Sequence, residues 1–407
     1  MTRPFDQLNP FVAAMQPSAT LAISARAAAL QRDGVDVISL SAGEPDFPTP
    51  APIVEAAHQA LRDGLFKYTA NAGTPELRAA IADKLTRVNG LRIEGRDVAA
   101  SDVVCSNGAK QSIAQTILAA CGPGDEVVVQ APFWVSYPEQ IRLAGATPVE
   151  VRTEAADGYV LRPEALEAAL TDSTRALILN SPSNPTGAVA SRGEMEALAA
   201  VLRRWPRVLV VSDEIYEDVI FDAEHVSFGT LDGMADRTVT VNGFSKGYAM
   251  TGWRLGYLAG PRWLVSAVDT LQSQLTSGPS SITQAAGVAA LAMDRAPIDV
   301  MVAAFRARRD AVLARLNALD GVTCPTPQGA FYLFPDVSGV YGRTAPDGTV
   351  VADSLSLCRY LLEACGVALV PGEAFGDARG VRLSYATDLD TLMRAMDRIE
   401  AGVAALV

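Results

Sequence analysis

The chain has 407 residues, of which 49% are hydrophobic and 20% charged, with 34 basic against 46 acidic side chains. This is an ordinary globular composition, and it excludes a disordered, collagen-like or coiled-coil protein. A net charge of −12 without a basic stripe argues against a nucleic-acid binder. We interpret the densest basic group, Arg306, Arg308 and Arg309, as a solvated helix face.

The first forty-odd residues are expected to form an arm and a helix that pack against the C-terminal part. Met1 to Phe11 has no apolar core, so we expect no signal peptide. The apolar stretch 282–293 is too short to span a bilayer. His58 and His225 lie far apart, so no metal site is expected, and five cysteines without a CxxC pair suit a reducing, cytoplasmic compartment.

From about residue 100, short apolar runs alternate with helical stretches. The runs predicted as strands are 103–105, 126–130, 147–151, 176–180, 208–212, 238–241 and 255–259. The stretches predicted as helices are 110–120, 138–143, 163–170 and 193–203. This alternation is typical of an α/β domain with a mostly parallel sheet, and the continuous apolar runs indicate strands covered on both faces.

After about residue 295 the pattern changes to that of an α+β domain. Helices are predicted over 300–319, over 354–364 and from Leu389 onward, with short strand-like runs between them. We therefore expect three segments. Residues 1–49 would form an N-terminal arm and part of a small domain, residues 50–295 a large domain, and residues 296–407 the rest of the small domain.

Two residues stand at the ends of apolar strands. Lys246 lies in a glycine-flanked turn, where α/β sheets place ligand sites. A desolvated lysine can form a Schiff base, although a lysine in a surface loop is the plainer alternative. Asp213 ends a strand too apolar to be exposed, so its carboxylate needs a partner. That partner is either the protonated ring nitrogen of a cofactor or the backbone of a following helical turn.

Three further features point to binding. The proline-rich turn 181–187 holds Asn184 where it can donate a hydrogen bond. The turn 106–111 joins a strand to a helix, whose first N–H groups can hold an anion, although it matches no nucleotide fingerprint. Arg382 suits bidentate capture of a carboxylate, unless it is a solvated residue of an edge strand.

In combination and in this order, these features resemble the class I/II aminotransferases, which are pyridoxal phosphate enzymes of fold type I. The resemblance runs over nearly the whole chain and is strongest to the bacterial aspartate aminotransferases. The blocks that carry it are PSAT (17–20), SAGEPDFPTP (41–50), YTANAGTPELR (68–78), NGAKQ (107–111), NPTG (184–187), VSDEIYE (211–217), SKGYAMTGWRLGY (245–257), PQGAFY (327–332), VPGEAFG (370–376) and VRLSYATD (381–388).

The resemblance implies a seven-stranded, mostly parallel sheet between helices in a large domain, and a smaller α+β domain formed by both chain ends. It implies pyridoxal 5'-phosphate as the cofactor. Lys246 would bind it covalently and move the substrate proton, while Asp213 would pair with the ring nitrogen. Asn184 and Tyr216 would bond the ring oxygen, and Trp134 would stack on the ring.

The same resemblance assigns the phosphate end of the cofactor. Gly108, Ala109, Ser245 and Arg254 would hold the phosphate. Tyr68 would reach the phosphate of the neighbouring subunit, which implies a homodimer with shared active sites.

The residues implied to contact the substrate are Gly43, Trp134, Asn184, Arg382, Lys110 and Thr20. Arg382 would clamp the α-carboxylate and so fix the orientation of the substrate. Lys110 resembles the lysine that meets a distal carboxylate, with Thr20 as its helper. A lysine on the phosphate side or in solvent is the alternative.

The implied activity is transfer of an amino group from an L-amino acid, aspartate above all, to 2-oxoglutarate by a ping-pong mechanism. The partners are thus amino and 2-oxo acids. Gln16 stands where several relatives carry a basic residue, which argues against prephenate as a substrate. Aromatic or alanine specificity, a lyase on the same fold and an inactive scaffold are the other hypotheses, because a fold does not determine a function.

Overall fold

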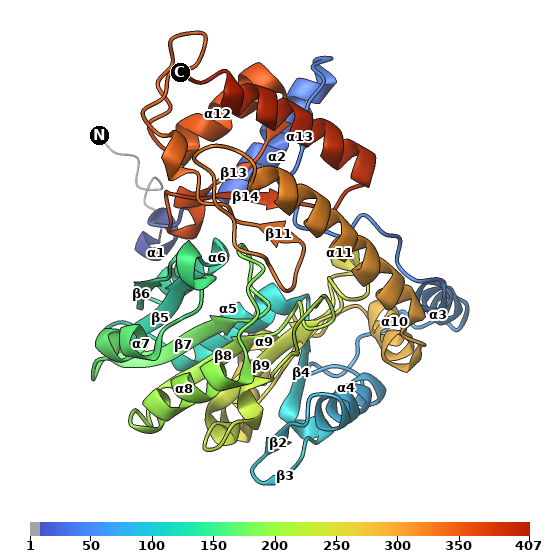
Figure 1. Ribbon diagram of the computed structural model, residues 1–407. Helices are drawn as coiled ribbons and strands as arrows, with labels where there is room; N and C mark the ends of the chain where they lie inside the picture. The colour runs from blue at the N-terminus through green and yellow to red at the C-terminus, as the bar shows by residue number, and fades with distance from the viewer. Residues whose placement is uncertain (1–8) are drawn as a thin grey trace, which may run out of the picture.

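The structure is a computed structural model that describes residues 9–407 (Figure 1). Most of the segment 1–11, for which we expect no signal peptide, lies outside the described residues, as does the beginning of the N-terminal arm. Among the helices of residues 9–407, none combines the length and the apolar character that crossing a membrane requires.

A seven-stranded sheet forms the centre of the larger part of the molecule. In spatial order its strands are β4 (Val103–Ser106), β10 (Gly256–Ala259), β9 (Thr238–Gly243), β8 (Leu209–Asp213), β7 (Thr174–Asn180), β5 (Glu126–Ala131) and β6 (Thr147–Arg152). Strand β10 runs antiparallel to both of its neighbours, and the other pairs are parallel. The predicted seven-stranded, mostly parallel sheet is confirmed.

Both faces of this sheet are covered, as the continuous apolar runs indicate. Successive side chains of a strand point to opposite faces. In β5, Val127 and Val129 accordingly enter one hydrophobic cluster, whereas Val128 enters another. All three are fully buried. The strand is therefore apolar at every position because each position faces a core.

Eight helices surround the sheet and its edges. They are α3 (Ala51–Arg62), α4 (Pro75–Arg87), α5 (Ala109–Ala120), α6 (Ser136–Leu143), α7 (Pro163–Ala169), α8 (Arg192–Arg203), α9 (Arg262–Leu275) and α10 (Ser281–Ala292). The four predicted helices of this part correspond to α5 to α8. Helices α3, α4, α9 and α10 come in addition to the prediction. Helix α4 does carry a local start signal, because Thr74 caps it and Pro75 is its first residue.

The second part of the molecule combines both ends of the described chain (Figure 1). Its N-terminal elements are α1 (Pro10–Ala13), α2 (Ala19–Arg32) and β1 (Ile38–Ser39), and β1 pairs in parallel with β12 (Val367–Ala368). In a three-stranded sheet, β14 (Val381–Ser384) lies between β11 (Tyr332–Leu333) and β13 (Val370–Pro371). The helices here are α11 (Ala296–Leu316), α12 (Ser354–Cys365) and α13 (Leu389–Ala404). The boundaries at residues 49 and 295 stay a prediction.

The remaining elements are short. A small hairpin joins β2 (Arg92–Ile93) to β3 (Arg96–Asp97). Single 3-10 turns are η1 (Ala100–Asp102), η2 (Ala155–Asp157), η3 (Phe228–Thr230), η4 (Ala235–Arg237), η5 (Thr251–Trp253), η6 (Ser338–Val340) and η7 (Gly372–Phe375).

The basic group on α11 differs from its interpretation as a solvated face. The Arg309 side chain is 4% exposed and donates to Asp222 at 3.1 Å. Arg308 binds both carboxylate oxygens of Asp46, at 2.7 and 2.8 Å. Of the three, Arg306 alone keeps about half of its side chain in solvent. The interpretation is wrong for the other two, because Arg309 ties α11 to Asp222 of the larger part of the molecule and Arg308 ties it to Asp46.

Candidate active site

A cavity of about 540 Å³ lies at the carboxyl ends of the central strands. Twelve of the fourteen residues predicted for the site line it, namely Thr20, Gly43, Ala109, Lys110, Trp134, Asn184, Asp213, Tyr216, Ser245, Lys246, Arg254 and Arg382. Gly108 lies directly behind this lining, at the start of α5. Tyr68 is 98% exposed and lies outside the cavity of its own chain.

Lys246 follows β9 and brings an amine to the cavity. Its Nζ donates a hydrogen bond to the carbonyl oxygen of Gly43 and lies 5.8 Å from the centre of the Tyr216 ring. Burial, and secondly the charge of Arg382, lower the pKa of Lys246 to about 8. About a tenth of the amine is therefore neutral near pH 7, far more than for an ordinary lysine, and the neutral amine is the form that attacks a carbonyl.

Asp213 ends β8 and is 3% exposed. Burial raises its pKa to about 6, against the opposing hydrogen bonds from Tyr137 and from the N–H of Ile215. The Tyr137 hydroxyl donates to Asp213 Oδ2 at 2.6 Å. No Lys, Arg or His of the described residues forms an ion pair with this carboxylate, which therefore has room for a cationic partner.

Tyr137 is absent from the sequence-based prediction. It lies at the start of α6, three residues after Trp134, and the two rings pack edge to face at 5.3 Å. Because Trp134 is one of the predicted residues, its neighbour one helical turn away was a candidate for the same site.

Asn180, the last residue of β7, connects two site residues. Its side-chain nitrogen donates to the backbone carbonyl of Asp213 at 2.9 Å. Its side-chain oxygen accepts from the backbone N–H of Asn184 at 2.8 Å. The parallel register places Asn180 beside Asp213, so one amide holds both segments at the strand ends.

Arg382 lies in the middle strand β14 and is 2% exposed, so the edge-strand alternative is wrong. It donates to Asn184 Oδ1 at 3.0 Å and to the Ser41 carbonyl at 2.7 Å. Its guanidinium lies 4.6 Å from the centre of the Tyr332 ring. Arg382 Nε is buried without a hydrogen-bond partner. A buried donor of this kind favours an anionic ligand.

Tyr216 and Tyr332 meet in the same region. Their hydroxyl oxygens are 3.0 Å apart, and both rings are buried. Tyr332 is also absent from the predicted site, although it ends the PQGAFY block. Its position explains the glycine at 43, because a Cβ there would come within 2.8 Å of the Tyr332 hydroxyl.

Another part of the site is formed where the start of α5 meets Arg254. Gly108 has a φ of 91° and precedes the first helical residue, Ala109. Arg254 Nη2 donates to the Asn107 carbonyl at 3.1 Å. A Cβ on Gly108 would lie 2.5 Å from Arg254 Nη2. The free N–H groups of the helix, the guanidinium and the nearby Ser245 together form a cradle for an anion.

Lys110 lies in the first turn of α5, with its Nζ 4.9 Å from the centre of the Trp134 ring. Burial, and secondly the charge of Arg254, lower its pKa. The ion pairs of the described residues do not include Lys110, so it offers a free cation to the cavity. Thr20 and Leu21 of α2 line the same cavity, and Thr20 Oγ1 is buried without a partner.

The family model "Aminotransferase class I and II" matches residues 35–399. The chain belongs to this family. This aminotransferase is 52% identical over 404 residues to the aspartate aminotransferase of Pinus pinaster. The match covers 98% of this chain and 81% of that protein. It is 46% identical to the aspartate/prephenate aminotransferase of Cereibacter sphaeroides, covering 98% of this chain and 99% of that one.

Among solved structures, the aminotransferase resembles the aspartate aminotransferase from Rhizobium meliloti. The TM-score is 0.94 at 44% identity, and the match covers 98% of this chain and 100% of the other. The predicted family, fold and class of enzyme are thus confirmed.

Proposed function

We propose that this aminotransferase uses pyridoxal 5'-phosphate to exchange amino groups between aspartate and 2-oxoglutarate in two half-reactions. The observation that carries the substrate is a pair of free cationic groups in one cavity. Arg382 Nε lacks a partner, and Lys110 lacks an ion pair among the described residues. Two such groups suit the two carboxylates of aspartate or 2-oxoglutarate, and the names of the relatives support the same substrate.

The cavity also fits the cofactor. Among residues 9–407 no basic side chain forms an ion pair with the buried Asp213 carboxylate, and a protonated pyridine nitrogen would supply a cationic partner. The cradle at Gly108 and Arg254 suits the phosphate. The chemistry that this cofactor supplies when bound is an electron-withdrawing ring, which stabilises the negative charge left on the substrate carbon after its proton is removed.

The chain's own residues perform the proton transfer and the positioning. Lys246 Nζ would hold the cofactor, and as a neutral amine it would take the proton from the substrate Cα. Its lowered pKa increases the neutral fraction near pH 7 above that of an ordinary lysine. Asn184 and Tyr216 would donate hydrogen bonds to the ring oxygen, with Trp134 against the ring face. Arg382 would fix the α-carboxylate and thereby the direction of the Cα–H bond.

We further propose that the enzyme is a homodimer, in which Tyr68 of the partner subunit completes each phosphate site. Tyr68 is 98% exposed in the single chain, and the nearby Phe66 is 67% exposed. Large aromatic side chains left in solvent are a feature of protein interfaces.

The cysteines support a place in the cytoplasm, which we also propose. All five are free thiols. Burial raises the pKa of Cys105 to about 12, and that of Cys324 to about 12 as well. Buried, unreactive thiols are usual in a reducing compartment.

A single-turnover titration of the cofactor-loaded protein with different amino acids tests the substrate. We expect rapid loss of the absorption of the lysine-bound cofactor with aspartate and glutamate, and little with phenylalanine. Lys110→Met should slow the reaction with aspartate about tenfold, the order expected for one lost contact to a charged group. Alanine, which lacks the distal carboxylate, is the matched control and should react equally with both proteins.

Other outcomes would select the other hypotheses. Rapid conversion by alanine or aromatic donors would contradict the aspartate proposal and leave the aminotransferase. Release of ammonia without a 2-oxo acid acceptor would indicate a lyase. No absorption from bound cofactor after addition of pyridoxal phosphate would contradict the whole proposal and favour an inactive scaffold.

Prephenate is a second candidate, because the Cereibacter relative carries it in its name. A residue of the N-terminal arm argues against prephenate as a substrate. Gln16 is uncharged where the resemblance leads us to expect a basic side chain, and its backbone N–H donates to Glu139 Oε2 at 2.9 Å. The same titration, run in reverse with the amino form of the cofactor, would show whether prephenate is accepted.

A further inference from the structure

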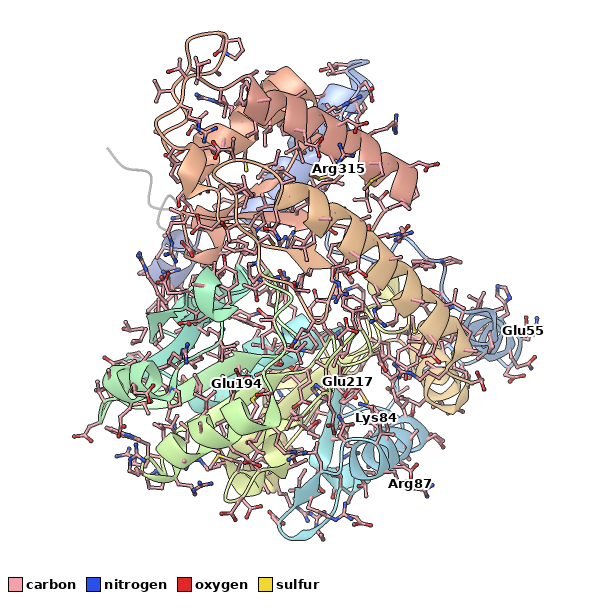
Figure 2. The ribbon with its side chains drawn as sticks, viewed as in Figure 1. Glu55, Lys84, Arg87, Glu194, Glu217 and Arg315 are labelled. Atoms are coloured by element: carbon pink, nitrogen blue, oxygen red, sulfur yellow. The ribbon has the colours of Figure 1, made fainter. Side chains whose placement is uncertain are left out.

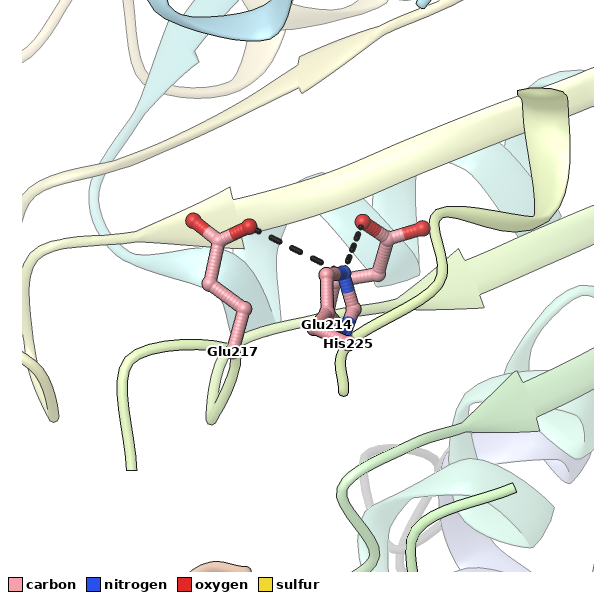
Figure 3. A group of neighbouring side chains, drawn as sticks. All are labelled: Glu214, Glu217 and His225. Atoms are coloured by element: carbon pink, nitrogen blue, oxygen red, sulfur yellow. Dashed lines mark hydrogen bonds and ion pairs between the residues drawn. The ribbon is translucent and has the colours of Figure 1, made fainter. Parts of the chain in front are cut away.

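A largely buried charged cluster, drawn in Figure 3, follows the residues of the cavity along the chain without lining the cavity itself. It consists of Glu214, Glu217 and His225, whose carboxylate and imidazole atoms lie within 4.8 Å of one another. The two glutamates belong to the turn that follows β8. Their immediate neighbours in this turn are Asp213 and Tyr216, which do line the cavity.

His225 bridges the two glutamates. Its Nε2 lies 2.9 Å from Glu214 Oε2 and 3.8 Å from Glu217 Oε2. Glu214 is 1% exposed and also accepts hydrogen bonds from Ser212 at 2.9 Å and from Ser227 at 2.6 Å. One imidazole therefore joins the first and the last glutamate of a single tight turn.

The other side of Glu217 is held from α4. Lys84 donates to Glu217, and Asn89 donates to its second oxygen at 2.7 Å. Figure 2 shows Lys84 and Glu217 approaching each other from α4 and from the turn. Two carboxylates face one ammonium and one imidazole, so the protonated imidazole makes the cluster electrically neutral. We interpret it as an ion-pair network and not as a metal site, because Lys84 already occupies the place of a cation.

The charge on His225 follows from its surroundings. Burial, the largest single influence, would lower its pKa. The charge and hydrogen bond of Glu214 and the charge of Glu217 together outweigh burial, so the pKa lies above its ordinary value. Several further charged and titratable groups face the network. They are Lys84 from α4, Asp218 from the turn, Arg295 from the start of α11, Tyr248 from the loop after Lys246, and Tyr257 from β10.

We propose that His225 is a positioning residue of the active site. By holding Glu214 and Glu217 together, it sets the place of the Asp213 carboxylate and the Tyr216 hydroxyl. Each glutamate is joined by one peptide bond to a residue that lines the cavity. A displacement of either glutamate would therefore also move Asp213 or Tyr216. The backbone N–H of Glu214 also bonds the Val241 carbonyl at 2.8 Å, which ties the turn to β9, the strand before Lys246.

This inference rests on the proposed cofactor, since Asp213 and Tyr216 matter through the ring that they would hold. It predicts that substitution of His225 changes cofactor binding, although His225 would contact neither the cofactor nor the substrate. His225→Gln keeps an N–H donor without the positive charge, and His225→Ala removes both. His58→Gln is the matched control, because His58 lies on α3 with 56% of its side chain exposed.

The experiment measures three quantities for each protein. They are the affinity for pyridoxal phosphate, the pH midpoint of the lysine-bound cofactor absorption, and the urea concentration at half unfolding of the cofactor-free protein. We expect His225→Ala to weaken cofactor binding about tenfold and to shift the pH midpoint. His225→Gln should restore part of the affinity, while the midpoint stays shifted because the charge is still missing. His58→Gln should change none of the three.

A purely structural role would give a different result. Earlier unfolding in urea, with unchanged cofactor affinity and unchanged pH midpoint in the folded variants, would overturn the proposal. If the unaltered protein does not bind pyridoxal phosphate, the proposed function fails and this inference fails with it. If the unaltered protein binds and the variants bind equally, the inference alone fails.

A second measurement needs no substitution in the network. The chain has only two histidines, so their imidazole NMR signals are separated once His58→Gln identifies one of them. Adding pyridoxal phosphate to the cofactor-free protein should move the His225 signal and leave the His58 signal in place. A His225 signal that does not move while the cofactor binds would contradict the coupling, which must be reciprocal.

Discussion

At the scale of single residues, burial moves Lys246 and Asp213 away from ordinary acid–base behaviour. The pKa of Lys246 falls to about 8, and that of Asp213 rises to about 6. In both cases the low-dielectric surroundings disfavour the charged form. The cavity is therefore arranged for a ligand that gives Asp213 a cationic partner and reacts with a neutral amine.

Asp213 should make the stability of the cofactor-free protein depend on pH. Its folded-state pKa of about 6 exceeds its ordinary value of 3.8, so the folded protein retains a proton that the unfolded chain has lost. The resulting stabilisation is complete below the unfolded pKa and disappears as pH rises through the folded one. Asp213→Asn should remove this contribution.

The measurement is urea unfolding of both cofactor-free proteins at a series of pH values. The difference in free energy of unfolding, unaltered protein minus variant, should fall as pH rises from about 4 to about 6 and stay constant above. Taking the difference cancels the other carboxylates. A difference that does not vary over this interval would show that Asp213 is not desolvated.

At the scale of elements, the junction between β4 and α5 shapes the anion cradle. Two backbone features meet there, a glycine with φ of 91° at position 108 and an arginine with φ of 56° at position 254. A side chain at position 108 would occupy the place of the Arg254 guanidinium. Position 108 therefore requires glycine for two reasons, the positive φ and the lack of room for a Cβ beside Arg254.

Gly108→Ala should displace Arg254 and weaken the binding of pyridoxal phosphate about tenfold, the order of one lost charge-assisted hydrogen bond. Gly124→Ala is the matched control. Gly124 has nearly the same φ, 92°, but an added Cβ would meet nothing within 4 Å. Fluorescence titration should show weaker binding for the first variant alone. Equal losses in both would attribute the effect to backbone strain.

At the scale of the whole molecule, the cavity is built from segments distant along the chain. Residues of α2 near the N-terminus, of the central sheet and of β14 near the C-terminus all line it. Arg309 of α11 and Asp222 link the two parts of the molecule directly. Tyr68 lies outside this cavity, and the role that we propose for it would require a second copy of the chain.

Shared sites predict that two defective chains complement each other. Lys246→Ala lacks its own amine, and Tyr68→Phe lacks the hydroxyl that it would give to its partner. A mixed dimer would contain one complete site, with Lys246 from one chain and Tyr68 from the other. Unfolding and refolding the two variants together should therefore give more activity than the sum of each refolded alone.

Sedimentation of the unaltered protein supplies the control for this prediction. A monomer at working concentrations would contradict the shared site. A dimer whose mixed form shows no gain in activity would place Tyr68 outside the site of either subunit.

The sequence by itself determined the family, the seven strands and about half of the residues that line the cavity. Apolar runs such as that of β5 were sufficient to predict the strands, because a strand buried on both faces is apolar at successive positions. Most of the predicted site residues follow strand ends or lie in turns, where glycine, proline and isolated polar residues mark them locally.

Only the tertiary structure decided the contacts between distant segments. Tyr137 contacts Asp213, which is 76 positions away in the sequence, and Arg382 contacts Ser41, which is 341 positions away. It also decided that Arg308 and Arg309 are largely buried, and that His225 joins the glutamates of the β8 turn. The physical reason is that the order of strands in the sheet sets these neighbours, and the pattern along the chain records burial but not which buried residues meet.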